Sequence, residues 1–154
     1  MAIVRTLARP MLASMFVIGG LDSLRHPDTK APAAEKVVRG LTEKLPGISD
    51  TAHVVRANGA VQVGAGGLLA LGKLPRLSAL ALAGSLVPTT LAGHSFWAET
   101  DPQKRSMQRI QFFKNLSMLG GLLLAAVDTA GKPSLGWRAK HAVVAVKEKV
   151  SGDD

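Results

Sequence analysis

Long stretches without formal charge alternate along the chain with short segments that hold nearly all of its charged residues. The longest uncharged stretch has 22 residues, from 77 to 98. A bilayer core of about 30 Å requires about 20 mostly apolar residues in a helix, so this stretch is long enough by itself. Three shorter stretches reach that length with flanking residues, whose charges lie near the ends and can extend to the headgroups. The pattern predicts an all-α fold, a bundle of four transmembrane helices at about 7–24, 54–72, 77–98 and 112–131.

Short apolar runs also occur in the buried helices of soluble proteins, and the segment 77–92 helps to separate the two environments. This segment is apolar on all sides, so it has no polar face to present to water. In a soluble bundle built from such segments, every helix would have to be surrounded by other helices on all sides. We therefore interpret the chain as a membrane protein.

Two segments outside the predicted transmembrane helices have patterns of their own. Between about 33 and 45, apolar residues recur at helical spacing among charged ones, which predicts an amphipathic helix in the first loop. Two positions remain open for it: flat in the membrane interface, or across the outer ends of the bundle. Residues 132–154 form a basic tail, in which Trp137 is expected to anchor at the interface. The membrane domain is thus expected to cover residues 1–131.

The composition narrows the classes of function. The chain has no cysteine, so it has no thiol chemistry, no disulfide and no thiolate metal site of its own. Its net charge of +8 comes from basic residues that border the apolar segments, which indicates attraction to anionic lipid headgroups of the bilayer. No basic stretch is interleaved with stacking aromatic residues, so nucleic acid is not an expected partner.

The orientation in the cell membrane depends on the distribution of lysine and arginine. With four crossings, both termini and the short turn containing Lys73 and Arg76 lie on one side, and the two sides carry nearly equal numbers of cations. The short turn concentrates two of them, whereas the mixed charge of the loop after the first helix suits translocation. We expect a multi-pass protein with both termini in the cytoplasm.

Threading the predicted helices up and down brings a group of polar residues to one end of the bundle. Ionisable groups at membrane depth are costly and usually find partners, so we expect Asp22 to pair with Arg56 or Lys114. Two interpretations of the group stay open: hydrogen bonds that lock helix packing, and a pocket for a polar headgroup such as that of a quinone. The candidate functional cluster comprises Asp22, Arg56, Asn58, Gln62, His94, Trp97, Lys114 and Asn115.

No catalytic constellation stands out in the sequence. The four histidines lack the spacing of a metal or haem site on one helix, and there is no nucleophile triad or phosphate-binding glycine loop. We assign no catalytic and no metal-binding residues, and a quinone stays open as a cofactor. Towards the other end of the last helix, Asp128 is expected near Arg9 and Arg76, where a packing salt bridge is favoured over a proton relay.

Several stretches of the sequence are distinctive when they are taken together: Arg9-Pro10, Gly19–Pro27, Asn58–Gly64, Gly93–Trp97, Phe113–Leu116 and Gly120–Leu124. With these stretches the chain resembles the DoxX family of small integral membrane proteins. The resemblance extends over about residues 5–131, and the long first loop and the basic tail are similar to the actinobacterial branch. It implies a four-helix membrane fold, and His94, Lys114 and Asn115 match its most recognisable positions.

The resemblance also implies a role beside redox enzymes. The family was named for a subunit of a thiosulfate:quinone oxidoreductase, and some members are membrane scaffolds of redox complexes. Together with the lack of cysteine, it implies a non-catalytic subunit or scaffold whose partner is a soluble oxidoreductase. Two alternatives remain open: a quinone-interacting oxidoreductase subunit, and a small transporter or permeability factor that oligomerises around a path near Pro88 and Asp128.

Overall fold

The fold was taken from a computed structural model, which describes residues 2–42 and 50–129. In these residues all the regular structure is helical, as the sequence predicts. The basic tail 132–154 with Trp137, and residues 43–45 of the predicted amphipathic helix, lie outside the described ranges. The elements are α1 (Ala2–Arg25), α2 (Pro27–Thr42), α3 (Thr51–Ala70), α4 (Pro75–Gly93), the short 3-10 helix η1 (Phe96–Ala98) and α5 (Pro102–Val127).

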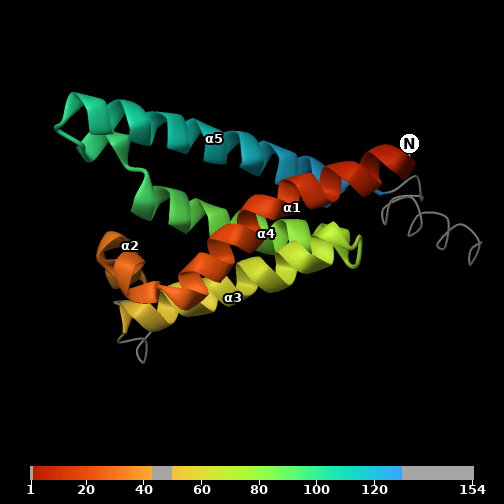
Figure 1. Cartoon of the computed structure of the whole chain (residues 1–154), viewed down its shortest axis with the longest axis horizontal. Helices are drawn as coiled ribbons and strands as arrows, with labels where there is room; N and C mark the ends of the chain where they lie inside the picture. The colour runs from red at the N-terminus through yellow and green to blue at the C-terminus, as the bar shows by residue number, and fades with distance from the viewer. Residues whose placement is uncertain (1, 43–49, 130–154) are drawn as a thin grey trace, which may run out of the picture.

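The four long helices alternate in direction along the chain, so the start of α1 and the end of α5 lie at the same end of the molecule (Figure 1). Helix α3 packs against α1 on one side and α4 on the other, and α4 packs in turn against α5. The shorter α2 lies at the opposite end, against α3 and α4 (Figure 1). The order of packing therefore places α3 and α4 at the centre of the structure.

Three of the described helical segments are long and apolar enough to cross a membrane: Ile3–Arg25, Pro75–Ala98 and Pro102–Val127. The apolar pattern of the sequence predicts four such helices. Helix α3 has the length, with 20 residues, but is not among the three. Its polar residues Arg56, Asn58 and Gln62 lower its mean hydropathy, which explains the difference.

Two helices begin earlier than the apolar pattern predicts. Helix α1 starts at Ala2, about five residues before the predicted start at 7, and Pro10 lies inside it. Helix α5 starts at Pro102, about ten residues before the predicted start at 112. There Asp101 caps the helix, since its carboxylate accepts hydrogen bonds from Gln103 N at 2.8 Å and Lys104 N at 3.1 Å. The apolar run shows where lipid can surround a helix, whereas the cap determines where the helix begins.

Helix α2 overlaps the predicted amphipathic segment but begins at Pro27, directly after α1. Its Val38 is buried, while Glu35, Lys36 and Arg39 are exposed. Helix α3 then begins at a cap formed by Asp50, whose carboxylate accepts a hydrogen bond from Ala52 N at 2.8 Å. This hydrogen bond stabilises the ionised form and holds the pKa of Asp50 below its ordinary value.

A tight turn connects α3 to α4. Gly72 adopts a φ of 69°, and Lys73 N donates to Leu68 O at 2.8 Å, which closes the last turn of α3. Leu74 also has a positive φ, 49°, just before Pro75 begins α4. These two left-handed residues allow the chain to reverse within four residues, so α3 and α4 form an antiparallel hairpin.

Apolar side chains cover the outside of the helices as well as the core. The core is formed by small and medium side chains such as Ala13, Ala79 and Leu82. On the outer faces, Ile18 is 65% exposed and Leu124 is 73% exposed. Soluble monomers rarely expose so many large apolar side chains, and a lipid environment explains them.

Candidate functional site

Four polar side chains link α3 to α4 near the middle of both helices. Gln62 Nε2 donates to Ser85 Oγ at 3.0 Å, and Ser85 Oγ donates to Asn58 Oδ1 at 2.8 Å. Asn58 Nδ2 donates to Thr89 Oγ1 at 3.2 Å, and the hydroxyl of Thr89 donates to the carbonyl of Ser85 at 2.8 Å. Gln62 is only 6% exposed, and two of the three polar residues that lower the hydropathy of α3, Asn58 and Gln62, thus find their partners on α4.

A second set of hydrogen bonds links α4 to α5. Asn115 is 6% exposed, and its Nδ2 donates to Thr90 Oγ1 at 3.0 Å. The hydroxyl of Thr90 donates to the carbonyl of Leu86 at 2.7 Å. His94 ends α4, and its Nδ1 lies 2.6 Å from Gln108 Oε1 of α5.

Pro88 lies in α4 between these two sets. Proline has no N–H to donate to the carbonyl four residues before it, which weakens the helix locally. Thr89 and Thr90, which follow it, each donate their hydroxyl back to a carbonyl of the preceding turn. The same two hydroxyl oxygens accept from Asn58 and Asn115, so the weakened turn of α4 is held by both neighbouring helices.

The predicted partners of Asp22 are wrong. Its carboxylate lies 2.6 Å from Lys30 Nζ and 3.2 Å from His26 Nδ1, and neither Arg56 nor Lys114 contacts it. His26 follows one turn later, and α2 folds back immediately after it, so both partners come from nearby in the chain. Closing such a short loop costs less conformational entropy than joining distant helices.

The other members of the predicted cluster divide between the interior and the surface. Arg56 and Lys114 have exposed side chains, and Trp97 is 54% exposed. Trp97 packs edge-to-face against Phe96 and Phe112, with ring centroids 5.2 Å and 5.7 Å away. An aromatic group of this kind at the end of membrane-spanning helices is typical of the interface with water.

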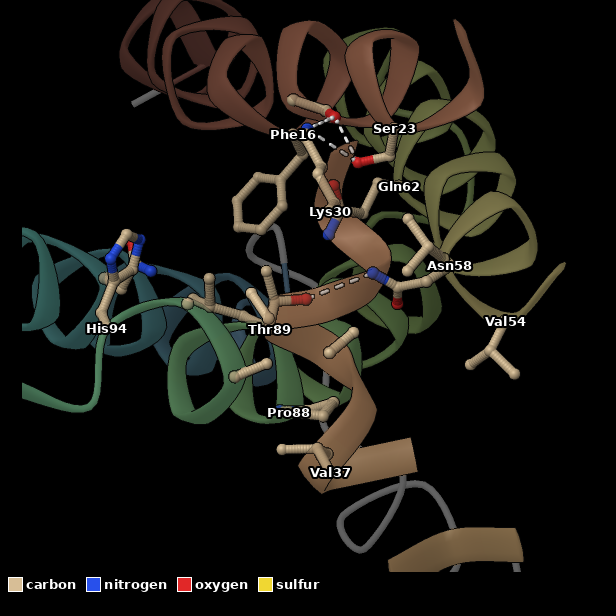
Figure 2. Close-up of a pocket in the computed structure, with 18 of the residues that line it drawn as sticks. Phe16, Ser23, Lys30, Val37, Val54, Asn58, Gln62, Pro88, Thr89 and His94 are labelled. Carbon is tan, nitrogen blue, oxygen red and sulfur yellow. Dashed lines mark hydrogen bonds between the residues drawn. The ribbon is translucent and has the colours of Figure 1, made fainter. Parts of the chain in front are cut away.

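A cavity of about 580 Å³ lies among α1, α2, α3, α4 and α5. Four residues of the predicted cluster line it: Asn58, Gln62, His94 and Asn115. The walls are otherwise mainly apolar, with Phe16 from α1 and Val37 from α2 among them (Figure 2). Apolar walls with a few polar groups are typical of small-molecule sites, and the volume lies within their usual range.

Lys30 is a polar residue of the cavity that the sequence analysis does not single out. Its ammonium group lies against the end of α1, where it donates to Ser23 Oγ at 3.0 Å and to Gly19 O at 3.4 Å (Figure 2). With the ion pair to Asp22 it has three partners. Lys30 therefore holds α2 over the cavity.

The structure also supplies partners that sequence reasoning missed. Ser85 and Thr89 are four residues apart, and this spacing places them on one face of α4 opposite Asn58 and Gln62. The two pairs could have been matched from their spacing in an antiparallel hairpin. The apolar pattern does not point to Gln108, because it predicts that the last helix begins after this residue, at 112.

A separate polar cluster lies at the opposite end of the molecule. Arg5 Nε lies 2.8 Å from Asp128 Oδ2, and Arg9 Nη2 lies 3.5 Å from the same atom. Arg76 instead donates to the carbonyl of Ala126 at 2.8 Å. The expectation of a packing salt bridge at Asp128 is thus met, with Arg5 as an additional partner. Among the described residues no group of three or more histidine, cysteine or acidic side chains could hold a metal ion.

The comparisons with known proteins give one match. The family model described as DoxX matches residues 4–95, which include α2 to α4, all but the first two residues of α1, and the cavity residues Asn58, Gln62 and His94. No curated protein and no solved structure matches the chain.

Proposed function

The chain belongs to the DoxX family, and from this premise we propose that it is a multi-pass membrane subunit or scaffold of a membrane-associated redox complex. The observation that carries the proposal is the use of the polar side chains inside the bundle. Hydrogen bonds join the helices to one another through Asn58, Gln62 and Asn115. Polar residues used in this way maintain the packing of a membrane domain. The redox chemistry then belongs to a partner enzyme.

In this proposal α3 crosses the membrane as a fourth span. Gln62 and Asn58 face α4 and are hydrogen-bonded there, so they need not contact lipid. Arg56 lies near the beginning of α3, where its side chain can extend to the headgroups. Helix α3 packs along α1 and α4, both of which have the length and composition of spans.

We further propose that α2 lies at the outer interface and that both termini are cytoplasmic. The exposed Glu35–Arg39 ion pair of α2, 2.7 Å, faces water in this arrangement, and Val38 faces the bundle. On the opposite side, Arg5, Arg9, Lys73 and Arg76 gather at the end that also contains the α3–α4 turn. A short loop rich in lysine and arginine favours the cytoplasmic side.

The test is purification of the tagged full chain from native membranes in mild detergent, followed by mass spectrometry of the eluate. We expect a soluble oxidoreductase at fixed stoichiometry. A test variant replaces four cations of the basic tail by glutamine: Arg138, Lys140, Lys147 and Lys149. This variant should no longer copurify with the enzyme, although its membrane domain is retained. A chain that elutes without any enzyme, and that crosslinks in membranes only to itself, would exclude the scaffold role.

A quinone-interacting subunit is the second candidate, and the cavity is the observation that favours it. Its volume of about 580 Å³ and its mainly apolar walls suit a ring with part of an apolar tail. Half of the residues predicted as a polar cluster line this cavity: Asn58, Gln62, His94 and Asn115. An ultraviolet spectrum of the same eluate tests this candidate, because a bound quinone absorbs where this tyrosine-free protein absorbs only through tryptophan and phenylalanine.

A further inference from the structure

Two buried residues that line the cavity, Gln62 and Asn115, each have an amide oxygen without a hydrogen-bond partner among the described residues. The hydroxyl of Thr89 donates to a backbone carbonyl, so Thr89 Oγ1 must accept from Asn58 Nδ2, and Asn58 Oδ1 then faces the Ser85 hydroxyl. Ser85 has thus used its hydrogen and must accept from Gln62 Nε2. This order fixes the orientation of the Gln62 amide and leaves its Oε1 without a partner among the described residues.

The same reasoning applies to Asn115. Thr90 donates its hydroxyl to Leu86 O and must accept from Asn115 Nδ2, which leaves Asn115 Oδ1 without a partner in the part of the chain that the structure describes. Both residues line the cavity, and both are only 6% exposed. Among the described residues, every side-chain oxygen or nitrogen that is fully covered has a hydrogen-bond partner. Because these two oxygens have none, they are not fully covered, and there is open space beside them. Gln62 Oε1 lies opposite Gly19 of the cavity wall, 3.8 Å from the position that a Cβ there would take.

The other polar residues near these two amides already have partners. His94 Nδ1 lies 2.6 Å from Gln108 Oε1 of α5. Lys30, the cation of the cavity, has Asp22, Ser23 and Gly19 as partners. The unmet hydrogen-bonding capacity of Gln62 and Asn115 therefore consists of one acceptor oxygen and the second N–H on each amide group.

From these atoms we propose that the cavity binds an amphipathic molecule whose head carries a hydroxyl group. A hydroxyl donates to Gln62 Oε1 or Asn115 Oδ1 and can accept from the second N–H of the same amide. A head that only accepts leaves these oxygens unpaired in an apolar environment, which is unfavourable. The apolar body of the ligand lies against Phe16 and Val37. The proposal does not depend on a redox partner, since it concerns the isolated chain.

The experiment is calorimetric titration of the full chain in detergent with two pairs of probes. The first pair is para-heptylphenol and its methyl ether, and the second is octanol and its methyl ether. In each pair the ether has the same apolar body as the hydroxyl compound but lacks the hydrogen that the hydroxyl group can donate. We expect saturable binding of one hydroxyl compound per chain, with its ether weaker by about tenfold, the size of one net hydrogen bond. Tighter binding of the phenol assigns an aromatic head, and tighter binding of octanol assigns an aliphatic alcohol of the glycerolipid kind.

Two variants connect the binding to this cavity. Ala34→Phe fills the cavity from α2 without changing the hydrogen bonds and should abolish binding, whereas Ala60→Phe, the same change at an exposed position of α3, should not. Gln62→Met removes one acceptor at similar volume and should reduce the preference for the hydroxyl compound about three- to tenfold. Equal affinity for a hydroxyl compound and its ether, or binding that Ala34→Phe leaves intact, would overturn the proposal. A decyl-benzoquinone that binds as tightly as the phenol would overturn it too.

Discussion

Gly20 and Gly59 meet at the contact between α1 and α3, so closely that a Cβ on either residue would lie 2.8 Å from the carbonyl oxygen of the other. A third glycine of this contact, Gly66, would place its Cβ 2.9 Å from Val17 Cγ2. Small residues that let two backbones approach are the usual basis of helix packing in membranes, where lipid gives no hydrophobic drive for association. The contact between α1 and α3 thus depends on the absence of side chains.

We expect Gly59→Ala to destabilise the protein by about 1–3 kcal/mol, because the new methyl group can be accommodated only by separating two backbones. The control is Gly64→Ala on the same helix, where a Cβ meets no atom within 4 Å. That change should be neutral or should stabilise α3 by about 1 kcal/mol or less, since alanine favours helix. Thermal unfolding in one detergent measures both, and equal effects would show that α1 and α3 do not pack in this way.

Asn115 and Lys114 are neighbours in the sequence with opposite environments, and they should respond differently to substitution. Asn115→Leu removes the hydrogen bond to Thr90 between α5 and α4 and should cost about 1–3 kcal/mol of unfolding free energy. Lys114→Leu changes an exposed side chain and should have little effect. Unfolding of both variants in the same detergent gives the comparison. A larger loss for Lys114→Leu would mean that Lys114 has a role the structure does not reveal.

Asp128 connects the two ends of the described chain. Asp128→Asn removes the ion pair with Arg5, in which both side chains are about 30% exposed or less, and should destabilise the protein by about 1 kcal/mol. The effect should decline at high salt, because partly exposed ion pairs are screened. Glu35→Gln, which breaks the exposed pair with Arg39 within α2, is the control and should change stability less. Urea or detergent denaturation at two salt concentrations measures both variants.

The proposed four crossings can be tested by labelling introduced cysteines, because the chain has none of its own. His53→Cys at the start of α3 and Thr100→Cys before α5 should react in intact cells with a maleimide that cannot cross membranes. Lys73→Cys in the α3–α4 turn should react only after the cells are opened. If His53→Cys and Lys73→Cys react alike, α3 does not cross the membrane. If only Lys73→Cys reacts in intact cells, the termini are outside.

Much of the candidate site could be anticipated from residue types and spacing, but not the partners of its members. Asn58 and Gln62 lie four apart on α3, and in the structure both reach Ser85 of α4. Asp22 was expected to find a cation across the bundle, yet its partners come from the chain that immediately follows it. The sequence does not show that α1 ends at Arg25 and that α2 turns back at once, and this break determines which cation Asp22 meets.

The local pattern of the sequence is sufficient to establish that this protein is helical and apolar enough for a membrane. Those properties depend on local composition, because a run of apolar residues must be long enough to cover a bilayer and must satisfy its backbone within the helix. Which polar atoms remain unpaired depends instead on how the helices pack against one another. Gln62 Oε1 and Asn115 Oδ1 have no partner among the described residues because the hydroxyls of Thr89 and Thr90 in α4 are donated to carbonyls of their own helix beside Pro88. That outcome depends on the rotation of three helices about their axes, which no short stretch of sequence specifies.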